Sequence, residues 1–424
     1  MKGLRKVLQN SVWMAAEQIV RMIAGLFIGI WIARQLGSND YGALNLALAL
    51  SSLVGIFGTL GLTRTVVREL ALNVDDKVFA RRMVATTLAW RLVCSLICYV
   101  GTVAICLIYD QGRPLLVGIV AATIAFSSFD VIDLYFQSKA ASHHSVMARS
   151  MSFFVFLCVK VVLLLNHASV VFFAVATTLE AMCNALALWI AGRSYGNKIR
   201  LQDVDMRYGW TLIGRSWPEL FAGFACIVFM RIDQIMLGNM LGDTAVGQYS
   251  VASRLAESWY FIPSVLVASS FPGIVRQRAR NKTLYLKRIR QLMVVLVAAS
   301  YLVAALAMFC APWVIKTLFG SAYKDSAAIL VILVWSGLFV SLGTVSGSWI
   351  IAESKPMLNL TRNTYGAFAY IAFNFYLIPR YGTVGAAVGT LLSLSLAYLV
   401  CDFFNPQTRP IGILKIKALL LIWK

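Results

Sequence analysis

Residues 291–315 read QLMVVLVAASYLVAALAMFCAPWVI and contain no Asp, Glu, Lys or Arg. A helix needs roughly 20 apolar residues to cross the hydrocarbon core of a bilayer, which is about 30 Å thick. This stretch reaches that length without interruption. It therefore predicts a membrane-spanning helix, and the same pattern recurs on both sides of it.

The composition of the whole chain agrees with a membrane protein. Of its 424 residues, 60% are hydrophobic and 13% are charged, and its mean hydropathy is +0.77. Soluble domains have about 25% charged residues. These values exclude a soluble globular protein, a disordered chain and a nucleic-acid-binding module, although the net charge is +20.

The chain lacks the motifs of a soluble enzyme or of a metal protein. It contains no G-x-S-x-G sequence, no P-loop and no H-E-x-x-H sequence. Its eight Cys lie in apolar runs without a CxxC pair, and no Cys and His have the spacing of a zinc site. We therefore expect no metal site, no cofactor and no enzymatic activity.

Twelve segments reach the length of a membrane span. We interpret the first as a retained span rather than a signal peptide, because Glu17 and Arg21 interrupt its apolar run. Residues 411–424 are too short to span, and they predict an amphipathic helix on the membrane surface. The predicted spans are 11–33, 43–62, 84–108, 115–137, 148–166, 169–191, 216–237, 248–274, 291–315, 327–351, 358–379 and 383–404.

The positive charges are distributed unequally between the predicted connections. With Arg149, at the start of the fifth span, counted in the connection before it, the side that holds both termini has 27 of the 38 Lys and Arg residues, the opposite side has five, and six lie within spans. Lys and Arg accumulate in cytoplasmic loops, so both termini are predicted to be cytoplasmic. The basic loops also favour anionic membrane lipids. The external connections are all short, which argues against a membrane enzyme that polymerises or ligates glycans.

A short internal repeat suggests two related halves. Residues 36–42 read LGSNDYG and residues 241–247 read LGDTAVG, at an offset of 205 residues. Two halves with six spans each share one orientation and are related by an axis along the membrane normal. We therefore predict an all-α integral membrane protein with twelve transmembrane helices in two six-helix lobes, 1–200 and 201–404, and a cytoplasmic amphipathic tail, 405–424. Two unrelated glycine-containing hairpins are the alternative explanation of the repeat.

Several charged residues fall inside the predicted spans, where each costs about 3 kcal/mol on insertion scales unless it faces water or a partner. Glu17 and Arg21 lie one turn apart on one face, and Asp130 and Asp133 also share a face. Arg21 lies too deep to reach the membrane surface easily, so we expect it either in a cavity or in an ion pair with Glu17. The other charged positions are Arg91, Lys160, Glu180, Glu219, Arg231, Asp233, Arg254, Glu257 and Arg362.

The seventh and eighth predicted spans form a hairpin that sets charges opposite one another. Counting from a turn near residue 242 places Asp233 about level with Arg254, and Arg231 close to the level of Arg254 and Glu257. Such a cluster is either a structural salt-bridge lock or a charged gate that binds a headgroup. Pro263 is the only proline predicted deep inside a span, and it is a hinge candidate because it removes a helix hydrogen bond.

Several motifs of the chain resemble one family of membrane proteins. They are SWP at 216–218, MRIDQIMLG at 230–238, LGD at 241–243, VGQYS at 246–250, WYFIP at 259–263 and IPRYG at 378–382. In length, span count and motif order the whole chain is similar to the Wzx-type polysaccharide flippases of the multidrug/oligosaccharidyl-lipid/polysaccharide exporter superfamily. Gln248 departs from the family pattern, in which an apolar residue is expected.

The resemblance implies a flippase of the bacterial inner membrane. Such a protein moves an undecaprenyl-diphosphate-linked oligosaccharide from the cytoplasmic to the outer leaflet by alternating access, for the biosynthesis of O-antigen, capsule or exopolysaccharide. Its cationic cavity would be lined by the first, second, seventh and eighth spans. The substrate-binding candidates on these spans are Arg21, Arg64, Arg231 and Arg254, and the candidates for coupling or gating are Glu17, Asp130, Asp133, Asp233 and Glu257.

The chemistry of this substrate agrees with the residue types. Arg binds phosphate oxygens bidentately and stays charged, so it suits a diphosphate. The implied partners are the lipid-linked oligosaccharide, membrane lipids, and the polymerase and chain-length proteins of the same pathway. The driving force is either the membrane potential or proton antiport. A drug or cation antiporter of the same superfamily is the alternative, and its cavity would be dominated by acids.

Overall fold

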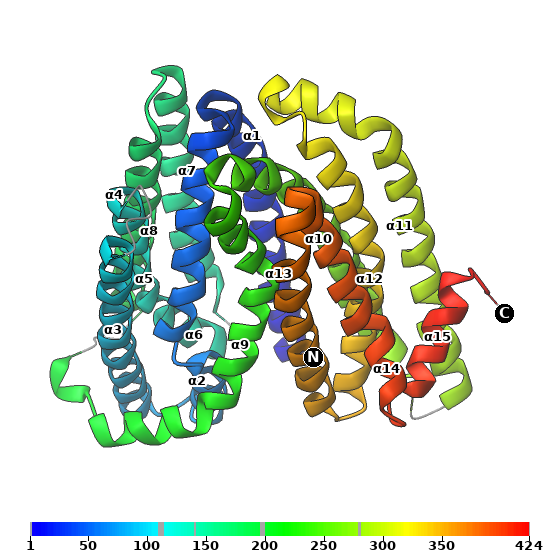
Figure 1. The fold of residues 1–424 in the computed structure, drawn as a ribbon. Coiled ribbons are helices and arrows are strands. Elements are labelled where there is room, and N and C mark those ends of the chain that lie inside the picture. The colour runs from blue at the N-terminus through cyan, green and yellow to red at the C-terminus, as the bar shows by residue number, and fades with distance from the viewer. Residues whose placement is uncertain (1, 109–113, 140, 196–199, 279–280, 424) are drawn as a thin grey trace. The chain divides into compact units, whose positions relative to one another are not determined.

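The computed structural model of the chain is helical (Figure 1). It describes residues 2–108, 114–139, 141–195, 200–278 and 281–423, and it contains no β-strand within them. Ten of its helical segments are long and apolar enough to cross a membrane. These segments are Ile19–Gly58, Lys77–Ile108, Pro114–Ser138, His143–Leu165, Val170–Ser194, Met206–Leu241, Asp243–Val275, Lys282–Phe319, Ser326–Ala352 and Met357–Phe404. The prediction of an all-α membrane protein is confirmed.

The chain divides into two compact units. The first consists of residues 1–36 and 43–231, and the second consists of residues 37–42 and 232–424. Helices α1 (Lys2–Gly58) and α9 (Met206–Leu241) therefore each contribute residues to both units.

The first unit has a core formed by α2, α3, α6 and α8, in which Val66, Met83, Phe136 and Leu188 are fully buried. The fourth predicted span corresponds to Pro114–Ser138, the broken fourth span, whose regular α-helical hydrogen bonding is interrupted at Ala122, between α4 and α5, and at the 3₁₀ turn η1 before α6, although the backbone there keeps right-handed helical angles. The elements of this unit are α1 (Lys2–Gly58), α2 (Leu62–Leu72), α3 (Lys77–Ile108), α4 (Pro114–Ala121), α5 (Thr123–Ser127), η1 (Ser128–Asp130), α6 (Val131–Ser138), α7 (His143–Leu165), α8 (Val170–Ser194), η2 (Leu201–Asp203) and α9 (Met206–Leu241).

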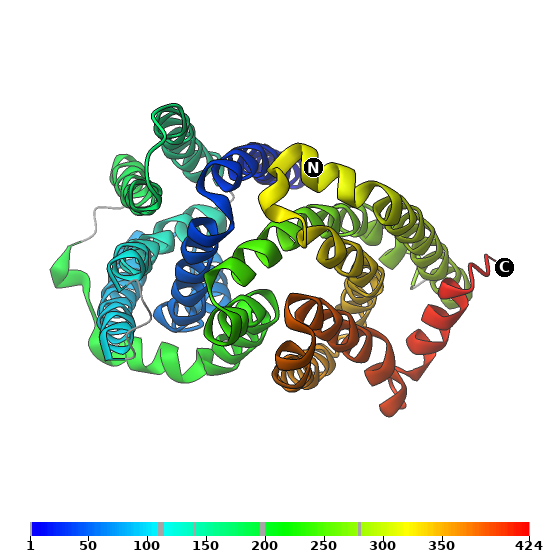
Figure 2. The same ribbon diagram turned by 45° about the horizontal axis from the view of Figure 1, so that its top comes forward.

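The second unit has its core between α10, α11, α12 and α15. Figure 2 shows α15 lying against α11, and Ile411 and Ala418 are the buried residues on that side of α15. A helix is thus present in the predicted tail. The elements of this unit are α10 (Asp243–Val275), α11 (Lys282–Phe319), η3 (Ser321–Tyr323), α12 (Ser326–Ala352), α13 (Pro356–Ser395), the π-helical η4 (Leu396–Val400), α14 (Cys401–Phe404) and α15 (Arg409–Leu419).

Two glycines interrupt long helices. Gly37 in α1 has φ 72° and ψ 174°, and Gly382 in α13 has φ 59° and ψ −138°. Positive φ is unfavourable for residues with a Cβ atom, so glycine suits both positions. Each of these two elements consists of two helical segments joined at the glycine. The two segments on either side of Gly37 correspond to the first two predicted spans, and those around Gly382 correspond to the last two.

The two motifs of the sequence repeat pack against each other within the second unit. A Cβ atom on Gly42 would collide with the carbonyl oxygen of Asp243, and a Cβ atom on Gly247 would collide with that of Ser38. Gly42 and Gly247 are 205 residues apart, and so are Ser38 and Asp243. The contact is therefore reciprocal, as contacts across a two-fold axis are.

Two sequence predictions about local structure are wrong. Pro263 is not the only proline deep inside a helix, because Pro218 lies well inside α9. The second predicted span ends at Gly58 rather than at residue 62, and a turn follows in which Gly61 has φ 63°. Arg64 therefore lies on the separate helix α2.

Candidate functional site

The first unit contains a polar cavity of about 440 Å³. Residues from α1, from the broken fourth span and from α8 and α9 line it. Among these lining residues, Asp130 is the only one with an ionisable side chain. The polar lining residues are Ser51, Ser52, Thr59, Thr123, Ser127, Asp130 and Asn184.

The hydroxyl groups of this cavity present acceptor oxygens. The hydroxyl of Ser51 donates to the carbonyl of Ala47 at 2.8 Å, and that of Ser127 donates to Ile124 at 2.7 Å. The hydroxyls of Ser52, Thr59 and Thr123 donate to main-chain carbonyls in the same way. Because each hydroxyl has one proton to donate, its remaining lone pairs are left to accept. The cavity therefore suits water, a protonated group or a cation better than it suits a phosphate.

Two acids and one arginine form a cluster at this cavity. Nη2 of Arg149 on α7 lies 3.0 Å from Oδ1 of Asp130 and 3.0 Å from Oδ2 of Asp133. Gln137, one turn further along α6, donates to Asp133 at 2.9 Å. The prediction that Asp130 and Asp133 share a face agrees with this geometry. Arg149 did not stand out in the sequence, because it lies only seven residues into α7 and was counted with the basic connections.

Asp233 is the centre of a buried hydrogen-bond network in the second unit. Its side chain accepts from the hydroxyl of Tyr370 at 2.8 Å and from the main-chain N–H of Gln234 at 2.7 Å. Thr390 lies 3.0 Å from the hydroxyls of both Tyr370 and Tyr249. The network joins α9, α10 and α13, and all four side chains are buried. Sequence analysis identified Asp233 but missed the two tyrosines, which read as ordinary apolar positions of their helices.

For the charge cluster predicted in the hairpin of the seventh and eighth spans, the structure shows one contact of Arg254 and one of Glu257. Nη1 of Arg254 lies 3.3 Å from the hydroxyl of Tyr41, which belongs to the first repeat motif. Glu257 accepts from Ser253, one turn earlier in α10, at 3.1 Å. The pairing of Asp233 with Arg254 stays a prediction, as does the choice between a structural lock and a gate.

The other cationic candidates have different surroundings. Arg21 lies on α1 with its guanidinium carbon 5.1 Å from the centroid of the Phe153 ring, a cation–π arrangement. The Arg64 side chain is 91% exposed, and Glu219 accepts from its main-chain N–H at 2.8 Å. Arg231 on α9 is half-buried. The side chain of Glu17 lies outside the described residues, so its pairing with Arg21 stays a prediction.

Further charged residues inside helices have structural partners. Lys160 on α7 and Glu180 on α8 form an ion pair at 2.6 Å. Arg91 is buried and donates to Thr63 at 3.1 Å, and Arg362 is buried and donates to Ser346 at 2.7 Å. Among the described residues, no group of three or more His, Cys, Asp or Glu lies close enough to hold a metal ion.

The fold is that of a class of solved membrane transporters. It is similar to the lipid II flippase MurJ, with a TM-score of 0.73, 11% identity and coverage of 96% of this chain and 91% of that one. It is also similar to a multidrug resistance MATE family transporter of the MOP superfamily, with a TM-score of 0.66, 15% identity and coverage of 96% and 99%.

Residues 7–277 match the model of the polysaccharide biosynthesis protein family. Because the match covers more than half of the chain, this protein belongs to that family. The chain is 23% identical over 428 aligned positions to a Shigella flexneri protein named as an O-antigen transporter, covering 94% of this chain and 97% of the relative. It is also 23% identical to the capsular polysaccharide biosynthesis protein CapF of Staphylococcus aureus, covering 51% and 54% of the two chains.

Proposed function

We propose that this protein is a flippase that moves an oligosaccharide linked to undecaprenyl diphosphate from the cytoplasmic to the outer leaflet of the bacterial inner membrane. The observation that carries the proposal is its membership of the polysaccharide biosynthesis protein family. The ten long apolar helices and the likeness to transporter folds support a transport role rather than catalysis. The products of the pathway would be O-antigen, capsule or exopolysaccharide, and its polymerase and chain-length proteins are the proposed partners.

The proposed topology has twelve crossings with both termini in the cytoplasm. The breaks at Gly37 and Gly382 support it, because each divides one long helical stretch, Lys2–Gly58 or Met357–Phe404, into two segments that are long enough to span. The reciprocal contact between Gly42 and Asp243 and between Gly247 and Ser38 supports a two-fold relation between the halves. We propose two six-helix lobes, 1–200 and 201–404.

The proposed site for the diphosphate uses Arg21, Arg64, Arg231 and Arg254. A glycan has many hydroxyl groups that are costly to move into hydrocarbon, so the protein must supply a wet path. The diphosphate needs fixed positive charge along that path, and Arg provides it with bidentate geometry. These four residues lie on α1, α2, α9 and α10. Pro263 in α10 is the proposed hinge.

Proton coupling through Asp130 is the proposed driving mechanism. Asp130 is the ionisable lining residue of the polar cavity, and that cavity presents acceptor oxygens that suit a protonated group. Asp133 shares its arginine, and Asp233, Glu257 and Glu17 are the further coupling or gating candidates. The membrane potential also favours outward movement of two negative charges, by about 2.3 kcal/mol per charge and 100 mV.

A drug or cation antiporter is the second candidate function. The acceptor-rich cavity around Asp130 favours it, because such a cavity suits a cation. Proteoliposomes distinguish the two functions. Loss of a defined lipid-linked oligosaccharide from one leaflet supports the flippase, whereas proton-driven movement of an organic cation without flipping supports the antiporter.

A further inference from the structure

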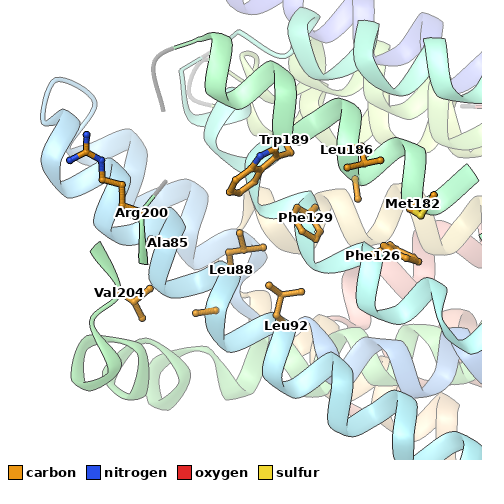
Figure 3. Close-up of a pocket in the computed structure, with 12 residues that line it drawn as sticks. Ala85, Leu88, Leu92, Phe126, Phe129, Met182, Leu186, Trp189, Arg200 and Val204 are labelled. Carbon is orange, nitrogen blue, oxygen red and sulfur yellow. The ribbon is translucent and has the colours of Figure 1, made fainter. Parts of the chain in front are cut away.

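A second cavity in the first unit is apolar. It has a volume of about 400 Å³ and lies between α3, the broken fourth span and α8. Figure 3 shows the side chains that form its walls, chiefly Leu88, Leu92, Phe126, Phe129, Leu186 and Trp189. Ligand pockets have volumes in this range, and most of their lining is hydrophobic and aromatic. The size and lining therefore suit a hydrocarbon chain.

One cationic side chain lies at one end of this cavity. Figure 3 shows Arg200 and Val204 at one end, with Met182 and Phe126 at the other. Arg200 is exposed and lies in the connection between α8 and α9. Its main-chain N–H donates to Asp203 at 3.3 Å. Within the part of the chain that the structure describes, its guanidinium has no hydrogen bond or ion pair.

We propose that this cavity binds one acyl chain of an anionic phospholipid, with the phosphate of that lipid at Arg200. The apolar walls exclude water from the chain, and burial of its methylene groups drives binding. The guanidinium binds phosphate oxygens through charge-assisted hydrogen bonds. The connection that holds Arg200 is on the predicted cytoplasmic side, where anionic lipid attracts basic residues. The apolar walls thus match the acyl chain of a phospholipid, and the charge of Arg200 matches its phosphate.

A phospholipid fits this cavity better than the lipid-linked substrate does. A diphosphate carries about two charges, and a glycan needs many hydrogen-bond partners. Arg200 is the only charged residue among the lining residues, and the indole of Trp189 is the only other polar group on a lining side chain. A single phosphate therefore matches this end of the cavity. The inference does not depend on the proposed flippase function.

Phe126 connects this lipid site to the polar cavity. Its side chain lines both cavities, and Asp130 lies four residues further along the broken fourth span. An acyl chain packed against Phe126 would hold this wall in one position.

The test uses two photoreactive lipids in vesicles that contain the full-length protein. Phosphatidylglycerol and phosphatidylcholine carry the same diazirine at the end of one acyl chain, and mass spectrometry locates the labelled residues. We expect both probes to label the region of Met182 and Phe126. We expect labelling by phosphatidylglycerol to be about 1.5- to fivefold stronger, since that is the contribution of one exposed ion pair.

Two pairs of variants test the contact with the lipid headgroup and the contact with the acyl chain separately. Arg200→Gln should abolish the preference for phosphatidylglycerol, whereas Arg193→Gln, also exposed and basic but not lining the cavity, should keep it. Leu186→Trp should decrease labelling by both probes, whereas Ile190→Trp, one turn further along α8 and outside the lining, should not. Leu186 and Ile190 are 52% and 62% exposed, so both variants should fold.

Three results would overturn the proposal. The first is equal labelling of the cavity by both probes in the parent protein. The second is a preference for phosphatidylglycerol that survives Arg200→Gln. The third is displacement of the phosphatidylglycerol probe by a trace amount of undecaprenyl diphosphate, which would assign the cavity to the polyprenyl lipid.

Discussion

Arg149 holds together the two acids at the polar cavity in the first unit. Arg149 lies 3.0 Å from both Asp130 and Asp133, and only the first of these acids lines the cavity. Asp133 is buried. Arg149 and Arg91 both attract the carboxylate of Asp130, whereas the neighbouring carboxylate of Asp133 repels it. A proton or a cation at Asp130 would relieve this repulsion.

Removing this arginine should destabilise the protein measurably. Arg149 is 26% exposed, so its ion pairs are intermediate between exposed and buried ones. Arg149→Gln should therefore lower the free energy of unfolding by more than the roughly 1 kcal/mol of an exposed pair and by less than the roughly 3–5 kcal/mol of a buried pair. Adding Asp133→Asn should restore most of the loss. The control is Arg68→Gln, which removes an exposed partner of Glu69. Thermal unfolding in detergent measures all three variants, and an Arg149→Gln curve like that of the control would contradict the cluster.

Sequence reasoning at the residue scale identified the acids but not their partners. The spacing of Asp130 and Asp133 is local, so their common face follows from helix geometry. Arg149, Tyr370 and Thr390 reach their partners through tertiary packing, which residue spacing within one helix does not encode. The prediction that Pro263 is the only proline deep inside a span is wrong because α9 begins ten residues before its predicted start and therefore has Pro218 in its interior.

At the scale of elements, a buried lysine attaches the tail helix. Lys415 on α15 is fully buried, lies 2.5 Å from a carboxylate oxygen of Asp402 and donates to the carbonyl of Tyr398 in the π-helical turn η4. Burial lowers the pKa of Lys415 to about 8, even though Asp402 opposes this shift. A π turn leaves carbonyl groups without their usual helical partners, and Lys415 satisfies one of them.

Breaking this pair should destabilise the tail. Lys415→Met should cost about 3–5 kcal/mol, because it leaves the buried carboxylate of Asp402 unpaired. Adding Asp402→Asn should recover much of that. In the parent the folded state binds fewer protons than the unfolded state between pH 8 and 10.5, so stability should rise with pH across that window. Melting curves that rise equally in Lys415→Met would show that another group causes the pH dependence.

The reciprocal contact of the repeat motifs gives a second prediction at this scale. Gly42→Ala should strongly decrease the amount of folded protein, because its Cβ would collide with the main chain at Asp243. Gly37→Ala has free space, but φ 72° with ψ 174° is a conformation that almost only glycine adopts, so it should cost about 1–3 kcal/mol. Gly101→Ala has neither restraint and should be neutral. Size-exclusion profiles and melting curves check this order, and a neutral Gly42→Ala would contradict the contact.

At the scale of the whole molecule, the apolar periodicity predicted most of the fold. The break near Asn166 is present, with His167 at φ 49°, and the long helices occupy the predicted segments. Twelve crossings require that the chain turns at the membrane surface at Gly37 and at Gly382. Hydropathy does not determine where such turns lie. Backbone conformation at a glycine depends on what packs around it.

Reporter fusions test the proposed topology. Fusions after Asp75 and Gln407 should be cytoplasmic, and a fusion after Asp243 should be external, because the Lys and Arg residues lie mainly on the side of the termini. Alkaline phosphatase and a fluorescent protein give opposite signals at each position. A cytoplasmic signal after Asp243 would rule out the twelve-crossing arrangement.

The central claim is transport of a lipid-linked oligosaccharide, and a leaflet assay tests it most directly. Proteoliposomes contain a defined oligosaccharide on undecaprenyl diphosphate, and an external glycosidase measures how much of it is accessible over time. The parent protein should make the internal fraction accessible, Arg21→Ala should abolish most of this, and Arg21→Lys should retain part, because lysine loses bidentate phosphate binding. Full flipping by folded Arg21→Ala would remove Arg21 from the site. No flipping by the folded parent, with a proton gradient and a membrane potential applied, would contradict the flippase function itself.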